Sequence, residues 1–376
     1  MQAPHGKTLR IIISGGGTGG HVFPAIAIAD ALRIREPGAE ILFVGAKGKL
    51  EMEKVPAAGY PIEGLWISGF QRSLSLRNLL FPVKLLHSLW RSWRIIRSFR
   101  PDVVVGVGGY ASGPLLEMAT RLGVPAVIQE QNSFAGVTNR LLGRKVQRVC
   151  VAFEGMERFF PADKVVVTGN PVRKRLRAGA EGLREEALAH FGLDKSCKTL
   201  LLFGGSMGAR TLNQAMEASR EVLAMRADVQ VIWQMGKMYS EVYGQSDTAR
   251  LPRVHALEFI DRMDLAYAAA DLVLCRSGAL TIAELALLGK PAVLVPSPVV
   301  TADHQTKNAM ALVERGAARL IADADAVADL LPEALRLLDD VAGLAALREG
   351  LKAFAKPEAA DRIADLIVEL AEKRTA

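Results

Sequence analysis

The sequence has few cysteines and no long apolar run. Its 376 residues contain three cysteines, which lie far apart at Cys150, Cys197 and Cys275. This number and spacing fit neither a disulfide framework nor a metal site, and they predict a reducing compartment. No uncharged apolar run reaches the roughly 20 residues that a membrane span needs, and the N-terminus lacks the apolar core of a signal peptide.

A second absence is local, because the segment from residue 72 to residue 100 contains no aspartate or glutamate. The whole chain has 47 basic and 40 acidic side chains, which gives a net charge of +7. The basic residues of the segment are Arg72, Arg77, Lys84, Arg91, Arg94, Arg97 and Arg100. These residues account for the whole excess of positive charge, which therefore requires a local explanation.

A glycine-rich turn follows the first buried stretch of the chain. Residues 11–13 are all isoleucine and predict a strand, and residues 15–20 hold five glycines before a predicted helix. Such a turn lets a phosphate approach the backbone at a helix N-terminus. The glycine spacing matches a dinucleotide fingerprint, but no carboxylate follows the next predicted strand, residues 41–44. This absence argues against a nicotinamide enzyme.

The same turn carries a histidine, His21. The first turn of a helix disfavours the imidazolium ion and favours the neutral ring. A neutral imidazole suits proton removal from an alcohol, so His21 is the candidate general base. A histidine that merely hydrogen-bonds a neighbouring loop is the alternative.

The second half of the chain repeats this order of strand, glycine turn and helix. Residues 199–203 predict a buried strand, and a second glycine-rich turn follows them. Pro171 imposes an extended backbone and marks a junction. We therefore predict an α/β protein with two Rossmann-like, doubly wound parallel-sheet domains, residues 7–170 and 171–357, that face a central cleft. A C-terminal helix, residues 358–374, is expected to dock back on the first domain.

Two polar motifs follow predicted strands in the second half. After residues 271–275, Ser277 is interpreted as a helix N-cap, and Glu284 lies near one turn further on, where it could accept both hydroxyls of a ribose. After residues 292–296, the polar segment 301–309 suits a ligand rich in hydroxyl groups. A capped helix with a solvated carboxylate, or a solvated loop, would give the same patterns.

The basic segment divides into two parts. Residues 67–81 place apolar side chains without clear periodicity beside two arginines, which suits an anionic membrane surface. From residue 83 onward, apolar and basic residues fall on opposite faces, as in an ordinary surface helix. No nucleic-acid-binding motif accompanies them, so no nucleic-acid partner is expected. The residues assigned to the membrane are Ile67, Phe70, Arg72, Leu74, Arg77, Leu79, Leu80 and Phe81.

Six motifs stand in the order found in one protein family. They are Gly16–Pro24, Gly108–Pro114, Glu130–Asn132, Gly169–Arg173, Gly204–Arg210 and Ser277–Thr281. Together they resemble the bacterial N-acetylglucosaminyltransferases that convert lipid I to lipid II in peptidoglycan synthesis. The resemblance covers nearly the whole chain, and six ordered motifs are far more specific than any one of them.

The resemblance implies a GT-B fold, with UDP-N-acetylglucosamine bound mainly by the second domain and the lipid acceptor by the first. It implies no cofactor and no metal, and a peripheral location on the cytoplasmic face of the inner membrane. The implied donor contacts are Thr18, Gly19, Gly20, Asn132, Arg173, Ser206, Ile260, Ala279, Leu280, Thr281, Glu284 and Gln305. The implied acceptor contacts are Gly108, Gly109, Tyr110 and Glu130.

The resemblance also implies a role for several of these residues, and their chemistry suits these roles. Arg173 and the amides after Ser206 would hold the diphosphate, the backbone of Ile260 would contact uracil, and Gln305 would contact sugar hydroxyls. Two positions depart from the family pattern. Met207 stands where glutamine is common, and Gln129 stands where histidine is common, which leaves His21 as the stronger candidate base.

The sequence therefore predicts an inverting glycosyltransferase that moves N-acetylglucosamine from its UDP donor to the 4-hydroxyl of N-acetylmuramic acid in lipid I. A UDP-N-acetylglucosamine 2-epimerase is the second interpretation, but it leaves the apolar basic stretch unexplained. A non-catalytic nucleotide-sugar-binding protein is the third, and His21 on the glycine turn argues against it.

Overall fold

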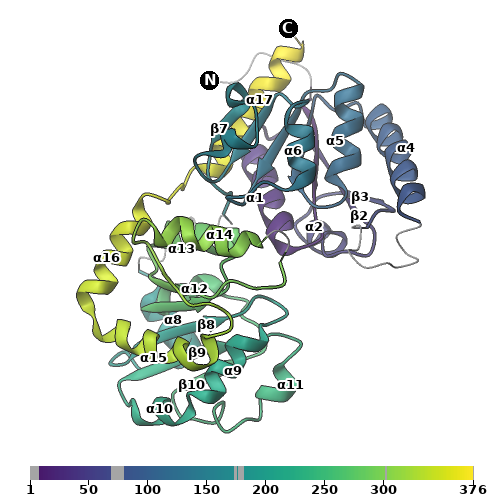
Figure 1. The fold of residues 1–376 in the computed structure, drawn as a ribbon. Coiled ribbons are helices and arrows are strands. Elements are labelled where there is room, and N and C mark those ends of the chain that lie inside the picture. The colour runs from purple at the N-terminus through teal and green to yellow at the C-terminus, as the bar shows by residue number, and fades with distance from the viewer. Residues whose placement is uncertain (1–7, 69–79, 173–175, 177–181, 301–302, 376) are drawn as a thin grey trace. The chain divides into compact units, whose positions relative to one another are not determined.

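The computed structural model describes residues 8–68, 80–172, 176, 182–300 and 303–375 (Figure 1). The chain forms two units, and each has its own sheet and hydrophobic core. Unit 1 comprises Met1–Arg173 with Lys356–Ala376, and unit 2 comprises Lys174–Ala355. No helix within the described ranges is both long and apolar enough to span a membrane.

Unit 1 is built on a seven-stranded parallel sheet in the order β3-β2-β1-β4-β5-β6-β7. The inner strands are buried on both faces, which explains their runs of β-branched residues. The strands are β1 (Arg10–Gly15), β2 (Glu40–Ala46), β3 (Ile62–Leu65), β4 (Val103–Gly108), β5 (Ala126–Glu130), β6 (Arg148–Val151) and β7 (Val165–Val167).

Helices cover both faces of this sheet, and side chains alternate between two cores. Ile11 and Ile13 belong to one core cluster, whereas Ile12 belongs to the other. The helices of this part are α1 (Gly19–Arg35), α2 (Glu51–Ala57), α4 (Phe81–Phe99), α5 (Ser112–Arg121), α6 (Val137–Gly143), the short 3-10 helices η1 (Met156–Arg158) and η2 (Ala162–Lys164), and α17.

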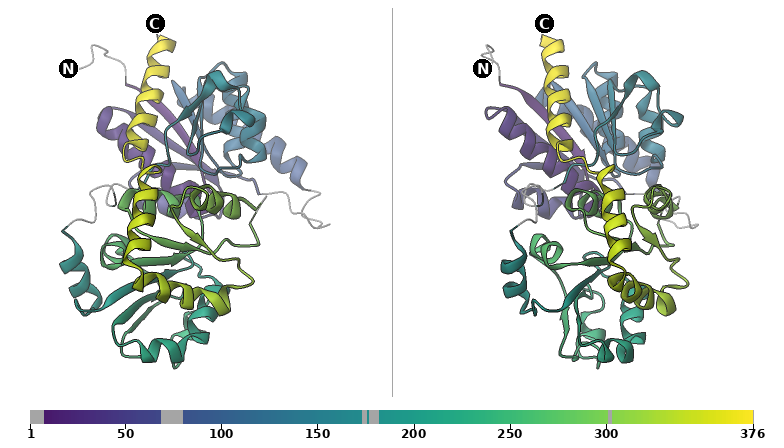
Figure 2. Two further views of the ribbon diagram at one scale, coloured as in Figure 1. Left: turned by 60° about the vertical axis from the view of Figure 1, so that its left-hand side comes forward. Right: turned by 90° about the vertical axis from the view of Figure 1, so that its left-hand side faces the viewer.

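The last helix, α17 (Ala359–Thr375), packs on the first unit although it ends the chain. It lies beside α1, as the two views of Figure 2 show. Ile363 and Ile367 are fully buried in the same core cluster as the side chains of β1. This packing buries the apolar stripe that is visible in the helix sequence.

Unit 2 holds a six-stranded parallel sheet in the order β10-β9-β8-β11-β12-β13. Its strands are β8 (Lys198–Phe203), β9 (Val229–Gln234), β10 (Val254–Leu257), β11 (Leu272–Cys275), β12 (Ala292–Leu294) and β13 (Arg319–Leu320). Its helices are α8 (Arg184–Phe191), α9 (Arg210–Ala218), α10 (Arg220–Met225), α11 (Ser240–Tyr243), α12 (Met263–Ala269), α13 (Ala279–Leu288), α14 (His304–Val313), α15 (Ala326–Asp339) and α16 (Val341–Lys352).

The predicted fold class, two doubly wound parallel-sheet domains, is confirmed. In each sheet the order reverses at one place, between β1 and β4 in unit 1 and between β8 and β11 in unit 2. Ligands of open α/β sheets bind outside the carboxyl ends of the strands at this reversal. The four loops that follow these strands are therefore where each unit's candidate site is to be sought.

Candidate active site

Two glycine turns meet at the carboxyl ends of β1 and β4 in unit 1. Gly108 and Gly109 have φ angles of 100° and 87°, a backbone region that favours glycine. A Cβ atom at Gly109 would overlap the backbone of Gly16, so no larger residue fits there. The predicted acceptor turn and the predicted phosphate turn are thus in direct contact.

His21 lies in the first turn of α1, against both glycine turns. Its Nδ1 atom is 3.1 Å from the carbonyl oxygen of Gly16 and 3.3 Å from Oγ1 of Thr18. Because a carbonyl oxygen can only accept a hydrogen bond, the contact with Gly16 favours the tautomer with the proton on Nδ1. The neutral ring then has its lone pair on Nε2, and a Cβ at Gly108 would lie 2.8 Å from that atom.

The start of α1 offers backbone N–H groups to an anion. Thr18 is the N-cap in an extended conformation, and its side chain makes no capping hydrogen bond. Thr18 and Gly20 are exposed, and Gly19 is half-buried. The first amides of a helix have no partner within the helix, which suits the predicted contact of this turn with the donor.

Glu130, at the end of β5, is buried, with 2% of its surface exposed. Its Oε1 accepts hydrogen bonds from the backbone and side chain of Asn132, and its Oε2 accepts from the Gly136 amide and from Nδ2 of Asn139, at 2.9–3.3 Å. The prediction that Glu130 contacts the acceptor is therefore corrected, because both oxygens are used to hold the loop after β5. Tyr110, beside the glycine turn, is 51% exposed and accessible.

Gln129 is fully buried and forms an amide network at the same strand end. Its Nε2 donates to Oδ1 of Asn170 at 2.9 Å, and Asn170 donates in turn to the carbonyl oxygen of Gln131 at 3.0 Å. This position therefore joins β5 to the chain after β7. It carries no group that could act as a base.

In unit 2, the turn after β8 presents Ser206 and Met207, which are both exposed. Gly208 packs directly against Gly236: a Cβ atom at Gly236 would overlap the backbone of Gly208, and one at Gly208 would overlap the carbonyl oxygen of Met235. Gln234 supports the turn, because its Nε2 donates to the carbonyl oxygen of Gly205 at 2.9 Å. Gln234 and Gly236 thus hold the turn in place, while Ser206 and Met207 remain exposed to solvent.

The loop after β11 leads into α13, whose N-cap is Gly278. The prediction that Ser277 is the N-cap is wrong, because its hydroxyl donates to the carbonyl oxygen of Gln305 at 2.9 Å. The candidate contacts Ala279, Leu280 and Thr281 form the first turn of the helix and are half-buried.

Glu284 lies further along α13 and has 8% of its surface exposed. Its Oε2 accepts a hydrogen bond from the hydroxyl of Tyr267 at 3.0 Å, and Tyr267 is fully buried. Burial, with the nearby charge of Glu284, raises the pKa of the Cys275 thiol. The carboxylate is thus held by a tyrosine of α12 that the sequence did not indicate.

Two further predicted contacts flank this loop. Gln305 uses its Oε1 to accept from the Ser297 amide at 2.8 Å, so its side-chain nitrogen is the group that could donate to a sugar. The Ile260 side chain is buried, which restricts this residue to backbone contacts. Arg276, which sequence reasoning missed, supports the loop by donating to the carbonyl oxygens of Val295 and Pro296 at 3.1 Å and by pairing with Asp323.

The residues assigned to the membrane are only partly supported by the structure. Ile67 is 7% exposed and belongs to the core cluster, so its assignment is wrong. Leu80 is 49% exposed and Phe81 is half-buried. The assigned residues that lie outside the described part of the chain are Phe70, Arg72, Leu74, Arg77 and Leu79, and among the donor contacts Arg173.

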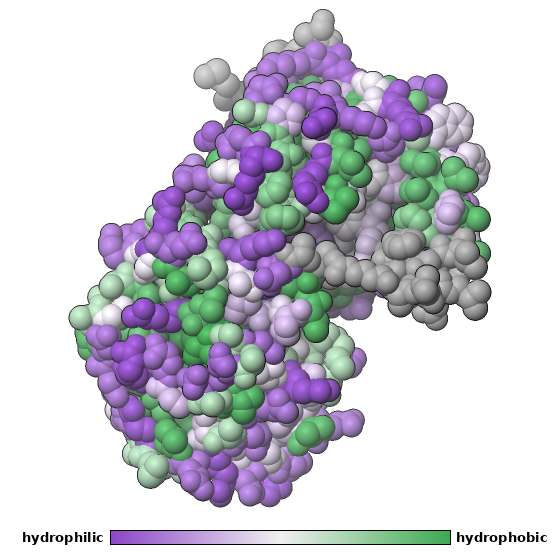
Figure 3. All heavy atoms as spheres, in the orientation of Figure 1, coloured by the Kyte–Doolittle hydropathy of each residue, from purple (hydrophilic) through white to green (hydrophobic). Residues whose placement is uncertain are grey.

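Helix α4 differs from the ordinary surface helix that its sequence predicts. The face of α4 that packs on the rest of unit 1 carries Ser88 and Ser92 together with Ile95 and Ile96. Ser88 is small enough to let the helix approach the sheet, and its hydroxyl donates to the carbonyl oxygen of Trp66 at 3.1 Å. The apolar side chains that point outward are Val83, Leu86, Trp90 and Trp93, which are 41–68% exposed. Hydrophobic residues, drawn green, gather over α4 in Figure 3.

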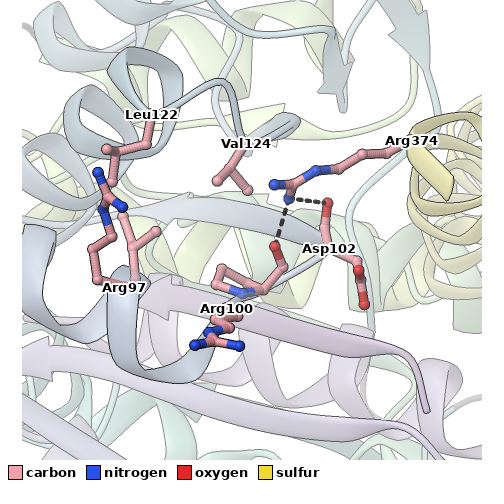
Figure 4. Close-up of a pocket in the computed structure, with 8 residues that line it drawn as sticks. Arg97, Arg100, Asp102, Leu122, Val124 and Arg374 are labelled. Carbon is pink, nitrogen blue, oxygen red and sulfur yellow. Dashed lines mark hydrogen bonds between the residues drawn. The ribbon is translucent and has the colours of Figure 1, made fainter. Parts of the chain in front are cut away.

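A cavity of about 690 Å³ lies at the opposite end of β4 (Figure 4). Arg374 of α17 reaches into it and donates to the carbonyl oxygens of Pro101 and Asp102, at 2.7 and 3.4 Å. The cavity is lined by Ile96, Arg97, Arg100, Pro101, Asp102, Leu122, Val124 and Arg374. It is separated from His21 by the length of β4, roughly 20 Å at strand spacing, so it is no part of this site.

Comparison with known families matches both units. The description "Glycosyltransferase family 28 N-terminal domain" fits residues 11–151, and "Glycosyltransferase family 28 C-terminal domain" fits residues 199–363. Among the residues that the structure describes, no group of three or more His, Cys, Asp or Glu side chains could hold a metal ion.

Curated relatives carry one name. A protein of Parabacteroides distasonis is 55% identical over 98% of this chain and 100% of its own length. A protein of Cytophaga hutchinsonii is 51% identical, with 98% of each chain covered. Both are called UDP-N-acetylglucosamine–N-acetylmuramyl-(pentapeptide) pyrophosphoryl-undecaprenol N-acetylglucosamine transferase.

Solved structures of other proteins are also similar to this chain. The crystal structure of MurG from Acinetobacter baumannii superposes with a TM-score of 0.74 at 30% identity, covering 96% of this chain and 99% of that one. A UDP-N-acetylglucosamine 2-epimerase from Neisseria meningitidis bound to UDP-N-acetylglucosamine reaches a TM-score of 0.68 at 15% identity, covering 97% and 100%. The second likeness shows a shared fold alone.

Proposed function

This chain belongs to glycosyltransferase family 28, and we infer that it transfers N-acetylglucosamine from its UDP donor to the 4-hydroxyl of N-acetylmuramic acid in lipid I, which gives lipid II for peptidoglycan synthesis. The observation that carries this conclusion is the identity of 55% to a transferase of that name over nearly the whole chain. The family resemblance expected from six sequence motifs is thereby confirmed.

We propose His21 as the general base of the transfer. The acceptor hydroxyl attacks C1 of the donor sugar and UDP leaves from the opposite side, so the anomeric configuration inverts. Nε2 of His21 takes the proton of the attacking hydroxyl. The acceptor is proposed to bind around Gly108, Gly109 and Tyr110, because the first of these residues lies directly against the His21 ring.

Unit 2 is proposed to bind most of the donor. The amides after Ser206 and those of Ala279–Thr281 suit the diphosphate, since both groups lie where a turn enters a helix. Glu284 would accept the ribose hydroxyls. The backbone of Ile260 would contact uracil, and the Gln305 amide would contact the sugar.

The predicted donor contacts of unit 1 are Thr18, Gly19, Gly20 and Asn132. They follow β1 and β5, strands whose carboxyl ends lie at the same sheet edge as His21. Arg173 remains a proposed diphosphate contact on the strength of the resemblance.

We further propose that unit 1 binds an anionic membrane surface through the outer face of α4. A protein without such a partner seldom leaves this many large apolar side chains exposed on one helix. Basic groups flank them, since Arg94 lies over the Trp90 ring at 5.9 Å and Arg97 over the Trp93 ring at 6.0 Å. Arginine beside interfacial tryptophan suits a headgroup region. We therefore propose a peripheral location at the cytoplasmic face of the inner membrane, where the lipid tail of the acceptor would be anchored.

Incubation with UDP-N-acetylglucosamine, with and without lipid I, tests the function. The proposal expects UDP release that depends on lipid I, with a β-1,4-linked disaccharide product. Formation of the 2-epimer from donor alone would identify an epimerase, the fold of which is shared. Donor binding without turnover in either mixture would indicate a non-catalytic binding protein and would refute the transferase.

A further inference from the structure

A buried carboxylate lies beneath the glycine turn of unit 1 and has no part in the mechanism so far. Glu51 is the first residue of α2 and is fully buried. Its Oε2 accepts a hydrogen bond from the Gly17 amide at 2.7 Å, and its Oε1 accepts from the Ala46 amide at 2.9 Å. A Cβ atom at Gly16 would overlap this carboxylate, so the turn is packed directly onto it.

The two ends of one peptide group connect this carboxylate to His21. The peptide between Gly16 and Gly17 directs its N–H toward Glu51 and its C=O toward Nδ1 of His21, at 2.7 and 3.1 Å. A hydrogen bond to a charged acceptor polarises the donor peptide and strengthens the acceptor at its other end. The negative charge of Glu51 therefore favours a proton on Nδ1 of His21, although the two side chains are separated by the backbone.

We propose that Glu51 is a positioning residue that acts on His21 through this peptide. It fixes the orientation of the Gly16 carbonyl, holds the His21 ring in the tautomer protonated on Nδ1, and so presents the Nε2 lone pair toward the acceptor hydroxyl. The inference rests on the proposed role of His21 as the base. It assigns to a carboxylate 30 residues away the task that a directly bonded carboxylate performs for histidine in a catalytic triad.

A merely structural role is the competing explanation, because Glu51 also joins the end of β2 to the turn after β1. An unpaired carboxylate is costly to bury, and two amide donors offset that cost without any effect on His21. The two explanations differ in one respect. A structural role changes stability alone, whereas a positioning role changes the tautomer of His21 and the turnover number.

The test compares Glu51→Gln with Glu53→Gln, a control on the same helix whose carboxylate is 73% exposed and pairs with Lys54. Glutamine keeps the size of Glu51 but removes its charge, and its NH2 group cannot accept from an amide. Steady-state kinetics at saturating lipid I give kcat and the donor KM. Histidine-selective ¹⁵N NMR at pH 8 reports the tautomer, and His21→Gln assigns the signal among the six histidines.

The proposal expects three results together. Glu51→Gln lowers kcat by roughly 10- to 100-fold, leaves the donor KM within about twofold of the wild-type value, and converts the His21 signal to a mixture of tautomers. Glu53→Gln changes none of them. In the wild-type protein the signal is that of a ring protonated on Nδ1, a result that does not depend on any variant folding.

Two results would overturn it. A wild-type His21 protonated on Nε2 would contradict the proposed hydrogen bond to Gly16. If Glu51→Gln folds and keeps the His21 tautomer and a near-normal kcat, Glu51 has a structural role only. The proposed transferase function would be unaffected by that result. If instead the wild-type protein shows no transfer to lipid I, the proposed function fails, and the tautomer measurement still decides whether Glu51 orients His21.

Discussion

Removing the hydroxyl group of Tyr267 should weaken donor binding through Glu284. The hydroxyl donates to the Glu284 carboxylate at 3.0 Å, and both residues are buried. Tyr267→Phe keeps the ring, which contacts Phe203 edge-on with centroids 6.0 Å apart, and deletes this one bond. The carboxylate then loses a partner that fixes its direction, although Glu284 itself remains.

The magnitude follows from the kind of hydrogen bond. Glu284→Ala removes a charged acceptor from the ribose and should cost about 2 kcal/mol of donor binding, or roughly 30-fold in KM. Tyr267→Phe should cost about 1 kcal/mol, or roughly fivefold, because it loosens the carboxylate without removing it. In the double variant the tyrosine has nothing left to orient, so KM should rise no further than about 30-fold.

The two single variants and the double variant form a double-mutant cycle. Initial rates of UDP release give the donor KM and kcat of each protein in it. Tyr243→Phe is the matched control, because this tyrosine packs against Trp233 in the core of the same unit and lies on another helix. An unchanged KM for a folded Glu284→Ala protein would refute the ribose assignment. A fivefold effect of Tyr267→Phe that persists in the Glu284→Ala background would show that the tyrosine acts by another route.

Three further predictions concern the base, the membrane and stability. His21→Ala should lower kcat by roughly 10²- to 10⁴-fold with donor binding kept, and turnover within a few-fold of wild type would exclude this base. Changing Leu86 and Trp90 to serine should reduce sedimentation with anionic vesicles while activity on a short-tailed acceptor is kept, and unchanged vesicle binding would reject the α4 face; Leu141→Ser, an exposed site on α6, is the control. Burial lowers the pKa of Lys290 from 10.5 to about 8, so the folded state binds fewer protons than the unfolded state above that pH and stability should rise toward pH 10. Lys290→Met should therefore raise Tm at pH 7, with a gain that shrinks toward pH 10, and a constant difference would contradict the assignment.

The fold class, and the glycine turns on which the proposed site is built, followed from local features of the sequence. Buried parallel strands are continuous apolar runs, and a glycine turn must follow a strand directly if a helix N-terminus is to meet a phosphate. Both features lie within about 20 consecutive residues, so they can be recognised without knowing what packs beside them. The same reasoning placed His21 on the first turn of α1, where the structure has it.

Reasoning from local sequence features could not predict hydrogen bonds between side chains and partners that lie far apart in the sequence. Glu51 reaches the Gly17 amide across 34 residues, and Tyr267 reaches Glu284 across 17. Neither pair leaves a periodic signal, because a hydrogen bond requires only that the fold bring two groups together. Glu130 was misassigned for the same reason, since its motif gives no sign that four neighbouring donors already occupy its oxygens.

The orientation of α4 separates what the sequence determines about a helix from what only the tertiary structure determines. Periodicity in the sequence determined that the helix has an apolar face and a second face of different character. It did not determine which face meets the sheet, because that depends on the shape of the surface that receives the helix. The tertiary structure places the small side chains of Ser88 and Ser92 inward and the bulky Trp90 and Trp93 outward, since close approach to the sheet leaves room for the former and none for the latter.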